Sequence, residues 1–209
     1  MTAGVAIPDT PAAVEARNVV RQMTSPLIFH HSCRVFLFGA MDPREGGPQL
    51  DAELLYIAAL FHDTGLARPF SARAQRFELD GADHARRFLL TRGFPAERVD
   101  VVWTAIALHT TPGVPARMGP EIAALARGVL TDVVGLGLDE IGRDRTSEVL
   151  DAHPRGDFKN EFLRAYADGQ AHRPDTTYGT VNADVLERFV PTFNRTNMVD
   201  RVMQSPWST

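Results

Sequence analysis

The stretch LLYIAALFHDTGLA, residues 54–67, decides the fold. Leu55 and His62 lie seven residues apart in an apolar run, so a helix places both on the stripe that packs inward. Asp63 follows directly, and Gly65 is expected to end the helix in a left-handed cap. A buried helix face that ends in two ionisable side chains needs partners for them. A cation bound by both His62 and Asp63 is one such partner.

Composition limits the classes of protein to consider. A chain of 209 residues can form one large domain, and we expect a single domain over 1–209 with a core at about 15–150 and a C-terminal helical extension at about 151–209. Hydrophobic residues make up 44% and charged residues 23%, as in ordinary globular proteins. The net charge of −4, without a basic cluster, disfavours nucleic acid as a partner.

Other features of the sequence indicate where the protein works. No apolar run approaches the ~18 residues of a membrane span, and the first residues lack the pattern of a signal peptide. We therefore expect a cytoplasmic protein without a membrane partner. The single Cys33 cannot form an internal disulfide and excludes a metal cage built from cysteines.

Helix signals recur along the chain. Thr10-Pro11 and Ser25-Pro26 each place a capping residue before a proline at the first helical position. There is no alternating β pattern and no internal repeat, so we predict an all-α protein of about eight or nine helices. Residues 42–49 should form a loop, and residues 67–77 should form a loop or short helix lying over the site. The expected helices cover about 11–23, 26–41, 51–62, 78–92, 95–109, 120–135, parts of 138–168, and 182–190.

Four of these helices place ionisable groups on faces whose other residues are apolar. The groups are His31, the pair His62 and Asp63, His109, and Asp132. Burying an unpaired carboxylate costs several kcal/mol, so Asp132 in VLTDVVGLG needs a partner. One shared cation would satisfy all of them. Nitrogen and oxygen donors suit Zn(II), Fe(II) or Mn(II), and water on such an ion has a pKa lowered towards neutrality. The expected chemistry is addition of water to an electrophilic centre.

These residues also carry a family resemblance. His31, His62-Asp63 and Asp132 resemble the H...HD...D signature of the HD-domain superfamily of helical metal-dependent hydrolases. HSCRVFLFGA, LLYIAALFHDTGL, RFELDGAD, AIALHTT and PRGDFKNEFL...SPW resemble the cyanamide hydratase-like branch, over about residues 15–207. The resemblance implies an HD-domain helical bundle with one bound divalent metal, commonly zinc or iron, and zinc is the ion we expect. It also implies hydration of the nitrile carbon of cyanamide to urea, a lyase reaction.

The resemblance assigns roles to individual positions. It implies that His31, His62, Asp63 and Asp132 bind the metal, with Asp63 holding a water proton as well. His109 fits no ligand of this signature; it is either an acid–base group near the substrate or a helix-end residue bonded to a carbonyl. His84 is a weaker catalytic candidate. The candidates for substrate contact are Thr110, Thr111, Phe77 and Glu78.

Three functions follow from this reading. The first is a metal-dependent hydratase or hydrolase of a small uncharged molecule, such as a nitrile attacked by hydroxide formed at the metal. The second is a phosphohydrolase of a nucleotide or another phosphate ester, for which only the arginines between residues 68 and 87 offer a basic pocket. The third is a metal-containing sensor without turnover. Apolar residues in the C-terminal tail would also allow a homodimer.

Overall fold

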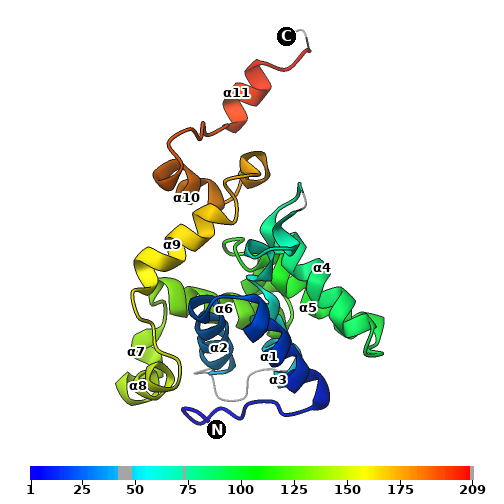
Figure 1. Ribbon diagram of the computed structural model, residues 1–209, viewed down its shortest axis with the longest axis vertical. Coiled ribbons are helices and arrows are strands. Elements are labelled where there is room, and N and C mark those ends of the chain that lie inside the picture. Colours follow the sequence, from blue (N-terminus) through cyan, green and yellow to red (C-terminus); the bar gives the residue numbers. More distant parts are fainter. Residues whose placement is uncertain (42–48, 73, 208–209) are drawn as a thin grey trace.

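Helix is the regular structure of the computed structural model, which describes residues 1–41, 49–72 and 74–207 (Figure 1). Within these ranges the one β feature is an isolated bridge between Thr2 and Val5. The all-α prediction is therefore confirmed. Most of the loop predicted at 42–49 lies outside the described residues. The α-helices are α1 Pro11–Met23, α2 Pro26–Ala40, α3 Ala52–Phe61, α4 Phe77–Leu90, α5 Ala96–Leu108, α6 Pro120–Val134, α7 Leu138–Ile141, α8 Arg143–Ala152, α9 Phe158–Asp168, α10 Asn182–Phe189 and α11 Met198–Met203.

The predicted helix starts are present as hydrogen-bonded caps. The Thr10 hydroxyl accepts from the backbone N–H of Ala13 at 3.2 Å, and the Ser25 hydroxyl accepts from that of Ile28 at 3.3 Å. Proline occupies the first helical position after each cap, where its missing N–H would have had no partner within the helix. Local sequence chemistry thus sets where α1 and α2 begin.

The described residues form eleven α-helices, more than the eight or nine predicted. Two of the additional helices are short: α7 has four residues and α11 has six. Neither is long enough to show an apolar period. Helix α7 begins after Gly137 and ends at Gly142, both with positive φ, so glycine joints divide the predicted helical region 138–168.

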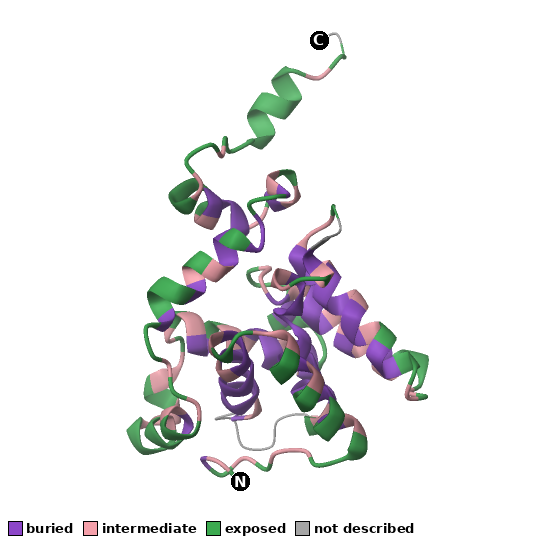
Figure 2. Cartoon of the chain, viewed as in Figure 1, coloured by how far each residue is buried: buried purple, intermediate pink, exposed green. Residues whose placement is uncertain are grey.

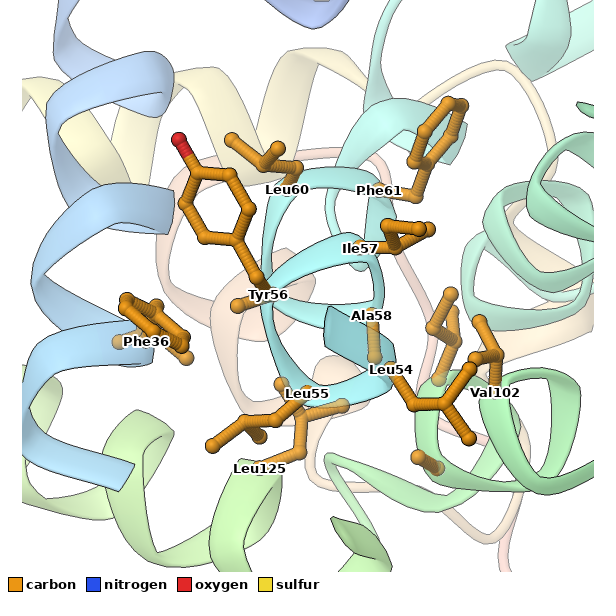
Figure 3. Close-up of a cluster of buried hydrophobic side chains, with 14 of the residues drawn as sticks. Phe36, Leu54, Leu55, Tyr56, Ile57, Ala58, Leu60, Phe61, Val102 and Leu125 are labelled. Atoms are coloured by element: carbon orange, nitrogen blue, oxygen red, sulfur yellow. The ribbon is translucent and has the colours of Figure 1, made fainter. Parts of the chain in front are cut away.

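Helix α3 lies at the centre of the hydrophobic core. Every residue from Leu54 to Phe61 is buried, so the helix is enclosed on all sides (Figures 2 and 3). Tyr56 points towards Phe36 of α2 and Leu54 towards Val102 of α5. The sequence predicted one inward stripe, whereas the whole surface of the helix is covered. The end of α3, where His62 follows, is consequently held inside the protein.

Helices α2 and α6 approach each other closely because glycines lie between them. A Cβ on Gly128 would lie 2.1 Å from the carbonyl oxygen of Val35, and one on Gly39 would lie 2.6 Å from that of Ala124. No larger side chain fits at either contact. This packing brings His31 on α2 beside Asp132 on α6.

The prediction that Gly65 forms a left-handed cap is wrong. Its φ is not positive, and it lies in a 3₁₀ turn, Thr64–Leu66, that continues from α3. A Cβ at this position would lie 1.9 Å from the carbonyl oxygen of Phe77. Glycine is required here because the turn packs directly against the start of α4.

The C-terminal part of the chain runs along one side of the molecule. Helices α9 and α10 follow each other there, and α11 extends away from the other helices (Figure 1). The apolar side chains of α11 are exposed, among them Met198, Val202 and Met203. No helix in the described ranges has both the length and the apolar character needed to cross a membrane.

Candidate metal centre

Three buried side chains converge where α3 ends beside α2. The Nε2 atoms of His31 and His62 lie 3.2 Å apart. Oδ2 of Asp63 lies 3.3 Å from Nε2 of His62 and 3.5 Å from Nε2 of His31. One donor atom from each residue lies within 4.8 Å of the other two. The structure therefore brings together three of the four predicted metal ligands.

The imidazole rings are fixed through their other nitrogen atoms. Nδ1 of His62 donates to the Ala59 carbonyl oxygen at 2.7 Å, and Nδ1 of His31 donates to Oδ2 of Asp132 at 2.6 Å. Carbonyl and carboxylate oxygens accept only, so each Nδ1 carries the proton and each Nε2 presents a lone pair. Two lone pairs facing each other at 3.2 Å repel unless a proton or a cation lies between them. This tautomer is the one that binds metals through Nε2.

Asp63 supplies the negative charge of the cluster. The residue is only 2% exposed, and its Oδ2 atom accepts no hydrogen bond from the described residues. Burial alone would raise the pKa of Asp63, but His62 and His109 hold that pKa well below its usual range. A buried, ionised oxygen without a hydrogen-bond donor, next to two imidazole lone pairs, fits a divalent cation.

His109 faces the same carboxylate from the end of α5. Its Nε2 lies 3.6 Å from Oδ1 of Asp63, and its ring stands perpendicular to that of His62 with centroids 4.9 Å apart. Its Nδ1 donates to the Ile106 carbonyl oxygen at 2.6 Å. The carbonyl bond expected in one interpretation is therefore present, and the other ring nitrogen faces the cluster, where the acid–base role stays a prediction.

Asp132 lies behind His31, at the nitrogen opposite the cluster. Its Oδ1 accepts from Nε of Arg34 at 2.7 Å and from Nη1 of Arg155 at 2.6 Å. Its Oδ2 accepts from Nδ1 of His31 at 2.6 Å and from Nη2 of Arg34 at 3.0 Å. Burial opposes ionisation, but these hydrogen bonds lower the pKa of Asp132 to about 2. The structure does not bring this predicted ligand into the cluster; the contact runs through His31.

Arg34 was not anticipated from the sequence as a site residue. Its side chain is fully buried, and its Nη1 also donates to the carbonyl oxygens of His153 and Pro154 at 3.1 Å each. The signal was present: Arg34 lies three residues after His31, on the same face of an apolar helix. A buried guanidinium requires a buried acceptor, and Asp132 is that acceptor.

His84 lies outside the cluster. Its ring stacks on Phe70 at 3.6 Å between centroids, and its Nδ1 lies 3.3 Å from the Thr64 hydroxyl oxygen. Burial lowers the pKa of His84 to about 4, with a smaller contribution from the charge of Arg87. The segment predicted as a cover contributes Phe70 to this stack and therefore packs against α4.

The predicted substrate contacts divide into two pairs. Thr110 and Thr111 line a pocket at the cluster. Phe77 and Glu78 lie behind it: Phe77 packs edge-on against His109, with centroids 5.5 Å apart, and Glu78 is fully buried. The Glu78 carboxylate accepts from the Thr110 hydroxyl, from Nη2 of Arg76 at 3.0 Å, and from Nδ2 of Asn182 at 2.9 Å. It therefore positions Thr110 from behind the pocket wall.

The pocket has a volume of about 790 Å³ and reaches His31, His62, Asp63 and His109. Its other walls come from α6, α7, α9, α10 and the segment after α5. None of the described residues of the predicted cover, 67–77, lines it. The sequence missed the contribution of α9, although Phe162 and Tyr166 there have the i, i+4 spacing of one helix face.

Comparison with known sequences agrees with this arrangement. The sequence model of the HD domain family matches residues 28–151, a range that includes His31, His62, Asp63 and Asp132. The chain belongs to the HD domain family. HD domains are typically metal-dependent hydrolases, and the cluster of His31, His62 and Asp63 is where this chain could hold a divalent ion. Among curated proteins, no sequence matches the chain. The HD match does not distinguish one branch of the family from another.

Proposed function

We propose that this HD domain is a metal-dependent enzyme that adds water to a polarised carbon in an uncharged group, in the manner of a cyanamide hydratase. The observation that carries the choice is the charge of the pocket. Of the described residues that line it, Arg127 is the one arginine or lysine, and its Nη2 donates to the Gly39 carbonyl oxygen at 2.5 Å. Asp63, Glu140 and Asp184 line the same pocket. With a divalent ion bound, the charges of these side chains and of the ion sum to about zero, so a phosphate dianion would meet no net positive charge there.

A divalent ion held by His31, His62 and Asp63 would supply an activated water at neutral pH, and Zn(II), Fe(II) and Mn(II) all suit these donors. The chain's own residues handle the proton. Nε2 of His109 faces Oδ1 of Asp63, so a proton held between them can pass to the nitrile nitrogen as the carbon gains oxygen. The hydroxyl of the water ends on the carbon and its proton on the nitrogen, which gives isourea, and transfer of the hydroxyl proton to nitrogen then gives urea. Asp132 acts through His31, by holding the imidazole in its orientation.

His109→Ala separates proton transfer from metal binding. We expect the variant to keep stoichiometric metal and to lose about 10²-fold or more in kcat, the range typical of a missing acid–base group. Metal analysis of the purified variant and the rate of urea formation measure the two effects. Loss of the metal together with the activity would make His109 a ligand. His153→Ala, the same change at a half-buried histidine that does not line this pocket, is the control for loss of an imidazole.

The reaction itself is tested on the full chain loaded in turn with Zn(II), Fe(II) and Mn(II). We expect urea from cyanamide and no phosphate from a panel of nucleotides. Family membership favours the phosphohydrolase as the second candidate, and phosphate release without urea would replace our proposal with it. Stoichiometric metal without turnover of either substrate class would instead indicate a sensor.

A further inference from the structure

We propose that the substrate carries an apolar body much larger than cyanamide, which the pocket beside the metal cluster encloses. This inference rests on the proposed function, because the reacting group is taken to be the nitrile of a substituted cyanamide. The pocket volume of about 790 Å³ lies within the ~300–1,000 Å³ typical of sites for drug-sized ligands. A molecule as small as cyanamide would leave most of this space to water.

A large part of the pocket wall is apolar for a structural reason. Helices α6 and α9 each contribute two apolar side chains at i, i+4 spacing, and a third such pair is formed by the residue before α10 and one within it, which places each pair on one helix face. These faces point into the same space, and the polar cluster comes from other elements, α2 and the ends of α3 and α5. The three pairs are Val129 and Val133 on α6, Phe162 and Tyr166 on α9, and Val181 and Val185 at α10.

Apolar side chains at the mouth of the pocket are left in contact with water. Leu130 and Val181 are each 42% exposed, and Val134 is 69% exposed. All three line the pocket, so the exposed apolar surface is continuous with its interior. Contiguous exposed apolar surface of this kind marks a binding site. The described part of the C-terminal tail beyond α10 does not line this pocket, and α11 extends away from it (Figure 1).

The occupant is an uncharged small molecule because the apolar surface leads directly to the reacting groups. His62, Asp63 and His109 lie in the same pocket as Phe162 and Val185. A substrate whose apolar body lies against α6, α9 and α10 therefore presents its polar end to the cluster. A cyanamide with one nitrogen-bound alkyl or aryl group has this shape.

The first test varies the apolar part of the substrate and keeps the nitrile of the cyanamide group. Cyanamide, N-methylcyanamide, N-butylcyanamide and N-octylcyanamide are compared as substrates of the metal-loaded full chain by the kcat/KM for formation of urea or of the corresponding N-alkylurea. We expect kcat/KM to rise about two- to fourfold for each added methylene, up to the fold-change set by about 0.8 kcal/mol per buried CH₂. Equal kcat/KM along the series would overturn the proposal.

A matched pair of variants tests where the body binds. Val181→Asp places a charge at the pocket mouth, directly before α10, where a negative charge interacts favourably with the N-terminus of the helix. Val14→Asp is the same change at a valine of α1 that is 38% exposed and does not line the pocket. We expect Val181→Asp to flatten the rise of kcat/KM with chain length and Val14→Asp to leave it unchanged. If kcat/KM rose equally steeply with alkyl chain length in both variants, the alkyl chain would have to bind away from Val181.

Binding of an uncharged apolar dye, N-phenyl-1-naphthylamine, separates this inference from the proposed reaction. We expect one dye per chain, displaced by N-octylcyanamide and bound at least about fivefold more weakly by Val181→Asp. Displacement without any urea formation would refute the hydration reaction and support the pocket assignment. Urea formation with no dye bound and no dependence on chain length would support the reaction and refute the pocket assignment. Sedimentation showing that Val181→Asp converts a dimer to a monomer would make this surface an interface between copies, and the inference would fail.

Discussion

Replacing Asp63 with asparagine is expected to remove stoichiometric divalent metal and to lower turnover by about 10³-fold or more, because a catalytic ion contributes several kcal/mol to the transition state. The physical reason is the position of its carboxylate. Oδ2 of Asp63 lies within 3.5 Å of two Nε2 lone pairs and is the buried anionic atom in contact with both. An amide can occupy the same volume, but it carries no negative charge to hold the cation.

Two measurements on the Asp63→Asn variant check this expectation. Metal analysis gives the bound ion per chain, and thermal melting with and without added Zn(II) gives the metal-dependent gain in Tm, which only a chain that binds the ion in its folded state shows. Asp100→Asn is the control, since the Asp100 side chain is 66% exposed and pairs with Arg86 on the surface. A variant that retains one metal per chain and the full gain in Tm would contradict the assignment of Asp63 as a ligand.

The sequence predicted well those parts of the fold that depend on local chemistry. The caps of Thr10 and Ser25 bond within their own first turn, so their effect does not depend on distant contacts. Gly65 shows the opposite case. A glycine after a helix usually indicates a left-handed cap, but here it is required because the start of α4 passes within reach of its missing side chain. Such a contact involves a segment that sequence spacing does not place.

Part of the cluster could be predicted from the sequence, because helix periodicity alone shows which side chains face the core. His31 and His62 stand on apolar stripes that must face the core, and the structure brings them together with Asp63. The sequence also indicated that the buried Asp132 carboxylate needs a partner. Sequence spacing did not show whether that partner is a metal ion or a guanidinium. The walls from α9 and α10 were not predictable, since the position of this part of the chain depends on contacts between distant residues. The Tyr166 hydroxyl donates to Asn182, and the Asn182 amide donates to Glu78 on α4.

Removing the carboxylate of Asp132 is expected to lower the stability of the protein strongly. Asp132→Leu leaves the fully buried guanidinium of Arg34 without its acceptor, and breaking such a pair lowers the free energy of unfolding by about 3–5 kcal/mol. Arg34→Met should destabilise in the same way by leaving the carboxylate short of donors. The double variant is expected to be less destabilised than Asp132→Leu alone, because no buried charge then lacks a partner. Denaturant unfolding of metal-free protein measures all three.

A conservative substitution at Asp132 tests whether this carboxylate binds the metal or only orients His31. Asp132→Asn keeps the shape of the side chain, and if the carboxylate acts by orienting His31 through Nδ1, metal affinity should fall about 10–100-fold without being abolished. Arg155→Met is the control, since Arg155 bonds Oδ1, whereas His31 bonds Oδ2, and Arg155 is partly exposed, so its loss should change the free energy of unfolding by about 1 kcal/mol or less. If Asp132→Asn instead abolished metal binding and left the metal-free protein as stable as before, the carboxylate would have to turn from Arg34 to the ion. Asp132 would then be the fourth ligand that the HD signature implies, because a group that only orients a ligand weakens binding but does not remove it.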